Sequence, residues 1–140
     1  MNEQWAAYQD SKAFADRVET LYGAGEDVLA LQKARYGKLV ERFEARFGAQ
    51  KGGLCFFSAP GRTEIGGNHT DHNNGRVLAA AVDLETIACV SATEDPTNVV
   101  DSEGFAPITV QLDNLDVREK DSGTTLALIR GTAGGMTGRG

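Results

Sequence analysis

The chain has 140 residues, of which 41% are hydrophobic and 24% are charged. This size and balance suit about one globular domain and exclude a wholly disordered chain. Asp and Glu outnumber Lys and Arg by 20 to 14, which gives a net charge of −6. The acidic balance argues against a dedicated nucleic-acid binder and against a protein that binds anionic membranes.

The N-terminus and the cysteines indicate the compartment. Residues 1–5 lack the basic region and the apolar run of a signal peptide, and no stretch is apolar for long enough to be a transmembrane helix. Cys55 and Cys89 lie among apolar residues and form no C-x-x-C pair, so we expect buried, reduced thiols rather than a catalytic or metal-binding pair. We therefore expect a cytoplasmic protein with no nucleic acid and no membrane as partner.

The first 50 residues are predicted to be helical. Residues 2–22 carry apolar side chains at helical spacing, and Gly23 and Gly25 are expected to end that helix. A second helix is predicted from about residue 26 to residue 47, with Gly48 in the left-handed conformation at its C-terminal end. Its outer surface interleaves Lys and Arg with Glu, which is typical of a solvated helix face.

Short apolar runs follow, and they predict strands. Residues 54–58 are expected to form a strand and residues 59–61 a turn. Residues 77–82 and 86–90 are predicted to be two further strands, joined around residues 83–85. Helices followed by neighbouring strands, without alternating βαβ units, indicate an α+β fold in which N-terminal helices precede a mixed or antiparallel sheet.

The last third of the chain predicts a hairpin and a short helix. Residues 98–100 and 108–112 are expected to pair, and a helix is expected from residue 124 to residue 130, capped by residues 121–122. The glycine-rich stretch from Gly131 onward contains no lysine and no Walker pattern. We interpret it as a linker or a frayed end rather than a phosphate cradle.

Residues 59–75 concentrate the side chains that can do chemistry. This segment holds both histidines of the protein, His69 and His72, with Asp71 between them, and it also holds Arg62. Its glycines allow the backbone to approach a ligand closely. Such a density of polar groups between two apolar runs suits a small polar ligand.

The residues alone leave three interpretations open. Asn68, His69 and Asp71 could bind sugar or polyol hydroxyls, because a carboxylate accepts strong charge-assisted hydrogen bonds from two of them. His69, Asp71 and His72 could instead ligate a metal, although no further histidine completes a zinc set. The loop could also only satisfy its own backbone. Arg62 gains importance beside a phosphate or a developing anion, and is otherwise a surface residue.

The segment also resembles the first signature of the galactokinases, whose superfamily includes homoserine, mevalonate and phosphomevalonate kinases. The family pattern P-G-R-V-N-L-I-G-E-H-T-D-Y aligns without a gap with P-G-R-T-E-I-G-G-N-H-T-D-H at residues 60–72. The likeness continues into residues 74–81. Residues 43–48 are similar to the end of the family's N-terminal helix, and residues 127–131 to the start of the helix before its nucleotide loop.

Galactokinases transfer the γ-phosphoryl group of ATP, with Mg²⁺, to the anomeric hydroxyl of galactose. The resemblance implies that Arg62 stabilises the transition state and that four residues bind the sugar: Asn68, His69, Thr70 and Asp71. It implies no metal ligand in this chain. Asn68 stands where the family usually has glutamate and His72 where it has tyrosine, so a kinase for another sugar such as arabinose or galacturonate is one alternative.

The resemblance further implies a partial protein. The family's Gly-Leu-Ser-Ser-Ser-Ala phosphate loop and its catalytic aspartate have no counterpart in this sequence. We expect residues 1–50 to form a helical extension and residues 51–140 to form the start of the superfamily's N-terminal lobe, truncated before the ATP phosphate loop. The full-length protein would make galactose 1-phosphate, and this chain alone would be inactive. A non-catalytic galactose-sensing relative is a second alternative.

Overall fold

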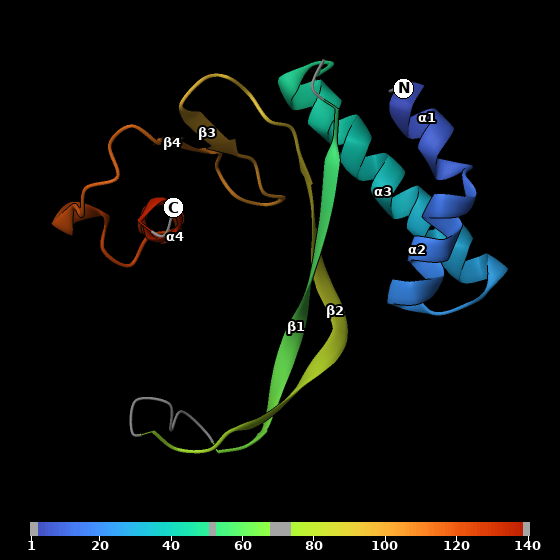
Figure 1. The fold of residues 1–140 in the computed structure, drawn as a ribbon, viewed down its shortest axis with the longest axis horizontal. Coiled ribbons are helices and arrows are strands. Elements are labelled where there is room, and N and C mark those ends of the chain that lie inside the picture. The colour runs from blue at the N-terminus through green and yellow to red at the C-terminus, as the bar shows by residue number, and fades with distance from the viewer. Residues whose placement is uncertain (1–2, 51–52, 68–73, 139–140) are drawn as a thin grey trace. The chain divides into compact units, whose positions relative to one another are not determined.

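The computed structural model describes residues 3–50, 53–67 and 74–138, and it confirms an α+β chain (Figure 1). The chain divides into two compact units, Met1–Ala92 and Thr93–Gly140. In the described part of the first unit, three helices precede one antiparallel pair of strands. The second unit contains a smaller antiparallel pair followed by a helix. No helix in the described ranges has the length and apolar character needed to span a bilayer.

The predicted helix over residues 2–22 is in fact two helices. Helix α1 spans Glu3–Gln9 and helix α2 spans Lys12–Tyr22. Ser11 separates them because its backbone is extended and its Oγ accepts a hydrogen bond from the Phe14 N–H at 3.2 Å. A serine that caps the following helix in this way ends the preceding one, and apolar spacing alone does not reveal the break.

Helix α3 spans Glu26–Phe47, as the apolar spacing predicts. Gly48 ends it, and its N–H donates to the carbonyl of Glu44 at 2.8 Å. The φ of Gly48 is positive, 74°, which glycine adopts without steric cost. Its ψ is −178°, so the residue leaves the helix in an extended conformation rather than in the left-handed helical one.

The core of the first unit joins all three helices to the strands. Its buried apolar residues are Trp5, Phe14, Val18, Tyr36 and Val40, and the partly buried residues that pack against them from the strand region are Leu54, Phe56 and Ile87. The indole of Trp5 is central, because its ring centroid lies 5.5 Å from the rings of both Phe14 and Phe56. Aromatic contacts of this kind hold the helices against the first half of the strand pair.

The strand pair is longer than the sequence predicts. Strand β1 spans Cys55–Gly66 and pairs antiparallel with strand β2, Leu78–Val90. The predicted turn at residues 59–61 and the predicted break at residues 83–85 are therefore both wrong. The two irregular stretches face each other across the ladder and form one bulge inside a continuous hairpin.

Proline and glycine explain why the bulge lies there. Pro60 faces Glu85 and Arg62 faces Ala81, so the register shifts between these two pairs. Proline has no N–H to donate to a ladder, and it is tolerated where the ladder is interrupted. A Cβ on Gly61 would lie only 3.1 Å from Val82 Cγ2, so a glycine lets the strands approach at this point.

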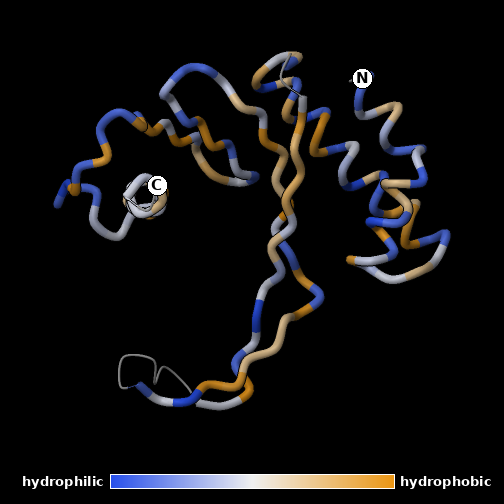
Figure 2. Tube along the Cα trace, viewed as in Figure 1, coloured by the Kyte–Doolittle hydropathy of each residue, from blue (hydrophilic) through white to orange (hydrophobic). Residues whose placement is uncertain are grey.

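The two halves of the hairpin differ in their surroundings. Beside the helices, Phe56 and Ile87 contribute to the core. Beyond Ser58, every described residue of β1 is exposed, and this half extends away from the helices (Figure 1). Figure 2 shows that much of the hairpin is nevertheless hydrophobic. Four of its large apolar side chains are mostly exposed: Phe57, Ile65, Leu78 and Leu84.

In the second unit, strands β3, Thr97–Val100, and β4, Ile108–Gln111, pair as predicted. A 3-10 helix at Glu119–Asp121 precedes helix α4, Thr125–Thr137. The prediction of a linker or frayed end from Gly131 is wrong, because glycines 131, 134 and 135 lie inside α4.

Tertiary contacts explain how α4 continues through its glycines. Arg130 is buried and pairs with Asp121, with 3.1 Å between Nη1 and Oδ2, and it donates to the Asn114 carbonyl at 2.8 Å. Thr124 caps the helix by accepting from the Ala127 N–H at 3.2 Å. The predicted cap at residues 121–122 is therefore wrong, because Asp121 serves the ion pair instead. Fixed contacts of this kind outweigh the cost of about 1 kcal/mol for each helical glycine.

Candidate functional site

Arg62, the one predicted catalytic residue, lies on β1 directly after the bulge. It faces Ala81 of β2 and is exposed to solvent. The strand pair holds its backbone, while no core packing surrounds its side chain. Its guanidinium is therefore accessible to an anion, as a role in phosphoryl transfer requires.

The four predicted sugar-binding residues, Asn68, His69, Thr70 and Asp71, lie outside the described residues, as does His72. The structure does describe the backbone on both sides of them. Gly67 has a φ of 106°, and a Cβ at this position would lie 2.4 Å from the carbonyl oxygen of Arg76. Only a glycine can occupy this place, because any side chain would collide with the returning backbone.

The contact between Gly67 and Arg76 gives the site its frame. Strand β1 ends at Gly66 and strand β2 begins at Leu78, and their ends are antiparallel neighbours. The predicted sugar-binding segment thus leaves and re-enters one hairpin at adjacent points. Arg62 lies on the same hairpin, four positions before the end of β1.

A polar network at the bulge escaped the sequence analysis. Glu85, which faces Pro60, accepts a hydrogen bond from Ser58 of β1 and pairs with Arg35 of α3, with 2.8 Å between Oε1 and Nη1. The side chain of Glu85 is only 12% exposed. Ion pairs across 50 positions of sequence leave no local pattern, so nothing in the sequence could have indicated this one.

The network keeps Glu85 ionised. Burial by itself raises the pKa of Glu85, but hydrogen bonds from Ser58, Tyr22 and Arg35, with the charge of Arg35, outweigh it and lower the pKa below its usual 4.5. Burial also raises the pKa of Tyr22, as does the hydrogen bond of 2.8 Å that it shares with Tyr36. Tyr22 therefore remains a protonated donor beside the carboxylate.

The cysteines are both free, and one of them departs from the prediction. Cys55 is exposed, while Cys89 is partly buried. Neighbouring residues of a strand point to opposite faces, so Phe56 enters the core and Cys55 faces solvent. Burial, with a smaller contribution from Cys55, raises the pKa of the Cys89 thiol to about 11. Cys89 is thus an inert thiol at neutral pH.

The described residues include no group of three His, Cys, Asp or Glu side chains placed to hold a metal ion. His69, Asp71 and His72 lie outside them, so the metal interpretation stays an alternative drawn from the sequence. Two hollows lie among the described residues of the first unit. Neither is lined by Arg62 or by any residue beyond Ser58.

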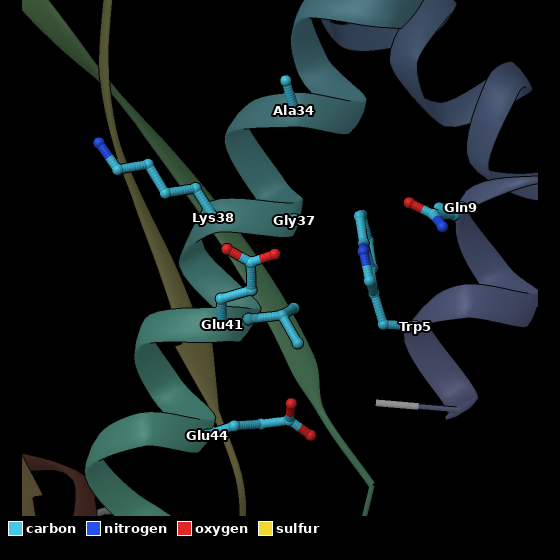
Figure 3. A pocket seen from close by; sticks show the side chains of 8 residues that line it. Trp5, Gln9, Ala34, Gly37, Lys38, Glu41 and Glu44 are labelled. Atoms are coloured by element: carbon cyan, nitrogen blue, oxygen red, sulfur yellow. The ribbon is translucent and has the colours of Figure 1, made fainter. Parts of the chain in front are cut away.

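The smaller hollow measures about 460 Å³ and lies between α1 and α3 (Figure 3). Figure 3 shows the indole of Trp5 facing α3. The side chains of Glu41 and Glu44 extend from α3. The larger hollow, about 660 Å³, is lined mainly by aromatic and apolar side chains of the helical core and of β1. Both belong to the packing of the helices, and the candidate site lies elsewhere on the hairpin.

Comparison with known proteins finds a family match that includes the hairpin. Residues 41–92 match the family model "Galactokinase galactose-binding signature". These residues include both strands, the bulge and the whole predicted sugar-binding segment. The hairpin is therefore similar to the galactose-binding signature of galactokinases.

Individual relatives agree. The chain is 38% identical over 88 residues to a galactokinase of Candida albicans, covering 60% of this chain and 17% of the relative. It is 38% identical over 85 residues to a galactokinase of Lactococcus lactis subsp. lactis, covering 61% and 21%. A galactokinase of Bacillus subtilis shares 38% identity over 74 residues, covering 53% and 19%. No solved structure matches the chain significantly.

The chain thus matches the galactokinases over residues 41–92. It spans about a fifth of the length of the curated relatives that it matches.

Proposed function

We propose that this chain supplies the galactose-binding hairpin of a galactokinase-type phosphotransferase. The full-length protein would transfer the γ-phosphoryl group of ATP to the C1 hydroxyl of galactose and release galactose 1-phosphate. The match of residues 41–92 to the galactose-binding signature carries this proposal. The frame formed by Gly67, Arg76 and the two strands supports it, because the same hairpin carries an accessible arginine, Arg62.

Each predicted site residue has a role in this proposal. The carboxylate of Asp71 accepts hydrogen bonds from sugar hydroxyls, and Asn68, His69 and Thr70 complete the polar contacts. Arg62 stabilises the negative charge that develops during phosphoryl transfer. Asn68 and His72 occupy positions that usually hold glutamate and tyrosine in the family. Because of these two differences, arabinose and galacturonate should be tested beside galactose.

The described residues of this chain offer no site for ATP or Mg²⁺. Glycines 131, 134 and 135 lie inside α4 and form no loop that could surround phosphates. The described residues gather no acidic cluster for a cation. Within this proposal, ATP and Mg²⁺ bind to other parts of a galactokinase-length protein, and the 140-residue chain alone makes no galactose 1-phosphate.

The proposal extends to organisation and compartment. Residues 1–50 form the helical extension and residues 51–140 the start of the N-terminal lobe. The helices share one core with the hairpin, through contacts such as that of Trp5 with Phe56, so we expect the extension to hold the site in place. The free thiols of Cys55 and Cys89 suit the reducing cytoplasm, where we place the protein.

Calorimetric titration of the purified chain with galactose tests the proposal. We expect binding by the native chain and a loss of at least about tenfold in affinity for Asp71→Ala, because no neutral group replaces a charged acceptor. Asp83→Ala removes an exposed carboxylate from β2 and is the matched control. Equal affinities of the Asp71→Ala variant and the native chain would disprove the role of Asp71.

The same titration separates the alternatives. Tighter binding of arabinose or galacturonate than of galactose would identify a kinase for another sugar. A full-length protein that binds galactose without turnover in the presence of ATP and Mg²⁺ would be a galactose sensor. Release of galactose 1-phosphate by the 140-residue chain would overturn the assignment of the ATP site to other parts.

A further inference from the structure

We propose that Glu85 is a positioning residue for Arg62. Its contacts with Ser58 and Arg35 fix the register of β1 against β2 at the bulge, and this register decides on which face of the hairpin Arg62 emerges. The inference rests on the proposed function, in which Arg62 acts on the transferred phosphoryl group. It concerns a residue that lies on the second strand and outside the segment from Arg62 to Asp71.

The bulge makes the register of the outer half of the hairpin vulnerable. Between the pairs Pro60–Glu85 and Arg62–Ala81, one residue of β1 faces three residues of β2, Val82 to Leu84. A slip of one residue would turn Arg62 to the opposite face, because side chains alternate along a strand. An interaction at the bulge must therefore select one register.

Side-chain packing does not select it in the outer half. Residues 59–66 of β1 are all exposed, so no core contact holds them. The last partly buried residue of β1 before Arg62 is Ser58, and Ser58 donates to the carboxylate of Glu85. The network thus lies at the boundary between the packed and the exposed halves of the hairpin.

Glu85 is also bonded to a helix of the extension. Its pairing with Arg35 joins β2 to helix α3, and the same guanidinium donates to Gln32 of that helix at 2.8 Å. A carboxylate fixed by an arginine on one side and a serine on the other ties two strands and a helix together. Polar networks of this kind specify one arrangement where apolar contacts would allow several.

Nuclear magnetic resonance of the whole 140-residue chain tests the inference. The variants are Glu85→Ala, Arg35→Ala and Ser58→Ala, with Lys12→Ala as the control, since it removes the exposed ion pair with Asp16. Three signals are followed: the cross-strand contact of Arg62 with Ala81, the exchange of the amides of residues 61–66, and the contact of Trp5 with Phe56.

We expect Glu85→Ala to keep the contact of Trp5 with Phe56 and to lose that of Arg62 with Ala81. The amides of residues 61–66 should exchange about tenfold faster or more, in line with the loss of a hydrogen bond to a charged group. The control should change none of the three signals. An unchanged Arg62–Ala81 contact with unchanged amide exchange in Glu85→Ala would overturn the inference.

A milder variant distinguishes a general loss of folding from a selective loss of the Arg62–Ala81 contact. If Glu85→Ala also loses the Trp5 signal, Ser58→Ala, which removes only one hydrogen bond, decides: selective loss of the Arg62–Ala81 contact supports positioning, and its retention overturns it. Galactose titration of the same samples tests the proposed function separately from these signals. A native chain that binds no sugar would contradict the proposed function, while the signals of Arg62 would still decide the role of Glu85.

Discussion

Arg35 of helix α3 and Glu85 of strand β2 form an ion pair with 2.8 Å between Nη1 and Oε1, although 50 positions of sequence separate them. Glu85 faces Pro60, the first residue of the P-G-R pattern that resembles the galactokinases. Helix α3 is thereby bonded to the hairpin at the bulge and helps to hold it there.

This ion pair predicts a loss of stability in acid. The pKa of Glu85 is lowered in the folded chain, so the carboxylate stabilises the fold fully above its usual pKa of 4.5. That contribution disappears as the pH falls through the lowered folded value. Glu85→Gln should therefore lower the free energy of unfolding at pH 7 and flatten its dependence on pH below about 4.5.

Urea unfolding of both proteins between pH 7 and pH 3 measures this effect. Asp83→Asn, at an exposed carboxylate two positions away, is the control and should follow the native profile. Parallel profiles for Glu85→Gln and the native chain would contradict the assignment.

A side chain at Gly61 should destabilise the bulge. In Gly61→Ala the new methyl group would lie 3.1 Å from Val82 Cγ2 and 3.2 Å from the Leu84 carbonyl oxygen. Overpacking of this kind costs about 1–3 kcal/mol. Gly66→Ala is the matched control, because a Cβ there meets nothing within 4 Å. Urea unfolding compares the two, and equal stabilities would show that the strands do not approach closely at Gly61.

The two thiols should differ in reactivity. At pH 8 an alkylating reagent should modify Cys55 first, because Cys55 is exposed. Cys89 is partly buried and its thiol pKa is raised to about 11, so very little of it is thiolate. Mass spectrometry of timed samples measures both rates. Cys55→Ser should leave only the slow reaction, and a fast reaction in that variant would refute the burial of Cys89.

Arg130→Ala should disrupt the second unit alone. Removing one partner of a buried ion pair costs about 3–5 kcal/mol, since the other charge stays buried. Asp121 is that partner, with 3.1 Å between the charged atoms. We expect loss of α4 and of the helical signal it contributes to circular dichroism.

The chain's single tryptophan makes the comparison specific. Trp5 lies in the core of the first unit, so its fluorescence should be unchanged in Arg130→Ala. Arg118→Ala, at an exposed arginine of the second unit, is the control and should keep the helical signal. A native helical signal in Arg130→Ala would refute the role of the buried pair.

The sequence by itself determined the parts whose signals are local. Helix α3 and the β3–β4 pair follow from apolar spacing and turn residues. Both signals come from residues close together in the sequence. A galactokinase-like segment was also predicted from the sequence, through residue types in a fixed order from Pro60 to His72. The family comparisons confirm the resemblance on which that prediction rested.

Tertiary structure decided the rest, because the deciding contacts join residues far apart in sequence. Pro60 and Gly61 indicate a turn when taken alone, but opposite Val82 to Leu84 they form a bulge in one long hairpin. The glycines of α4 favour a linker, but the pairing of Arg130 with Asp121 holds them in a helix. In both places the free energy of packing and pairing outweighs a weak local preference of the backbone.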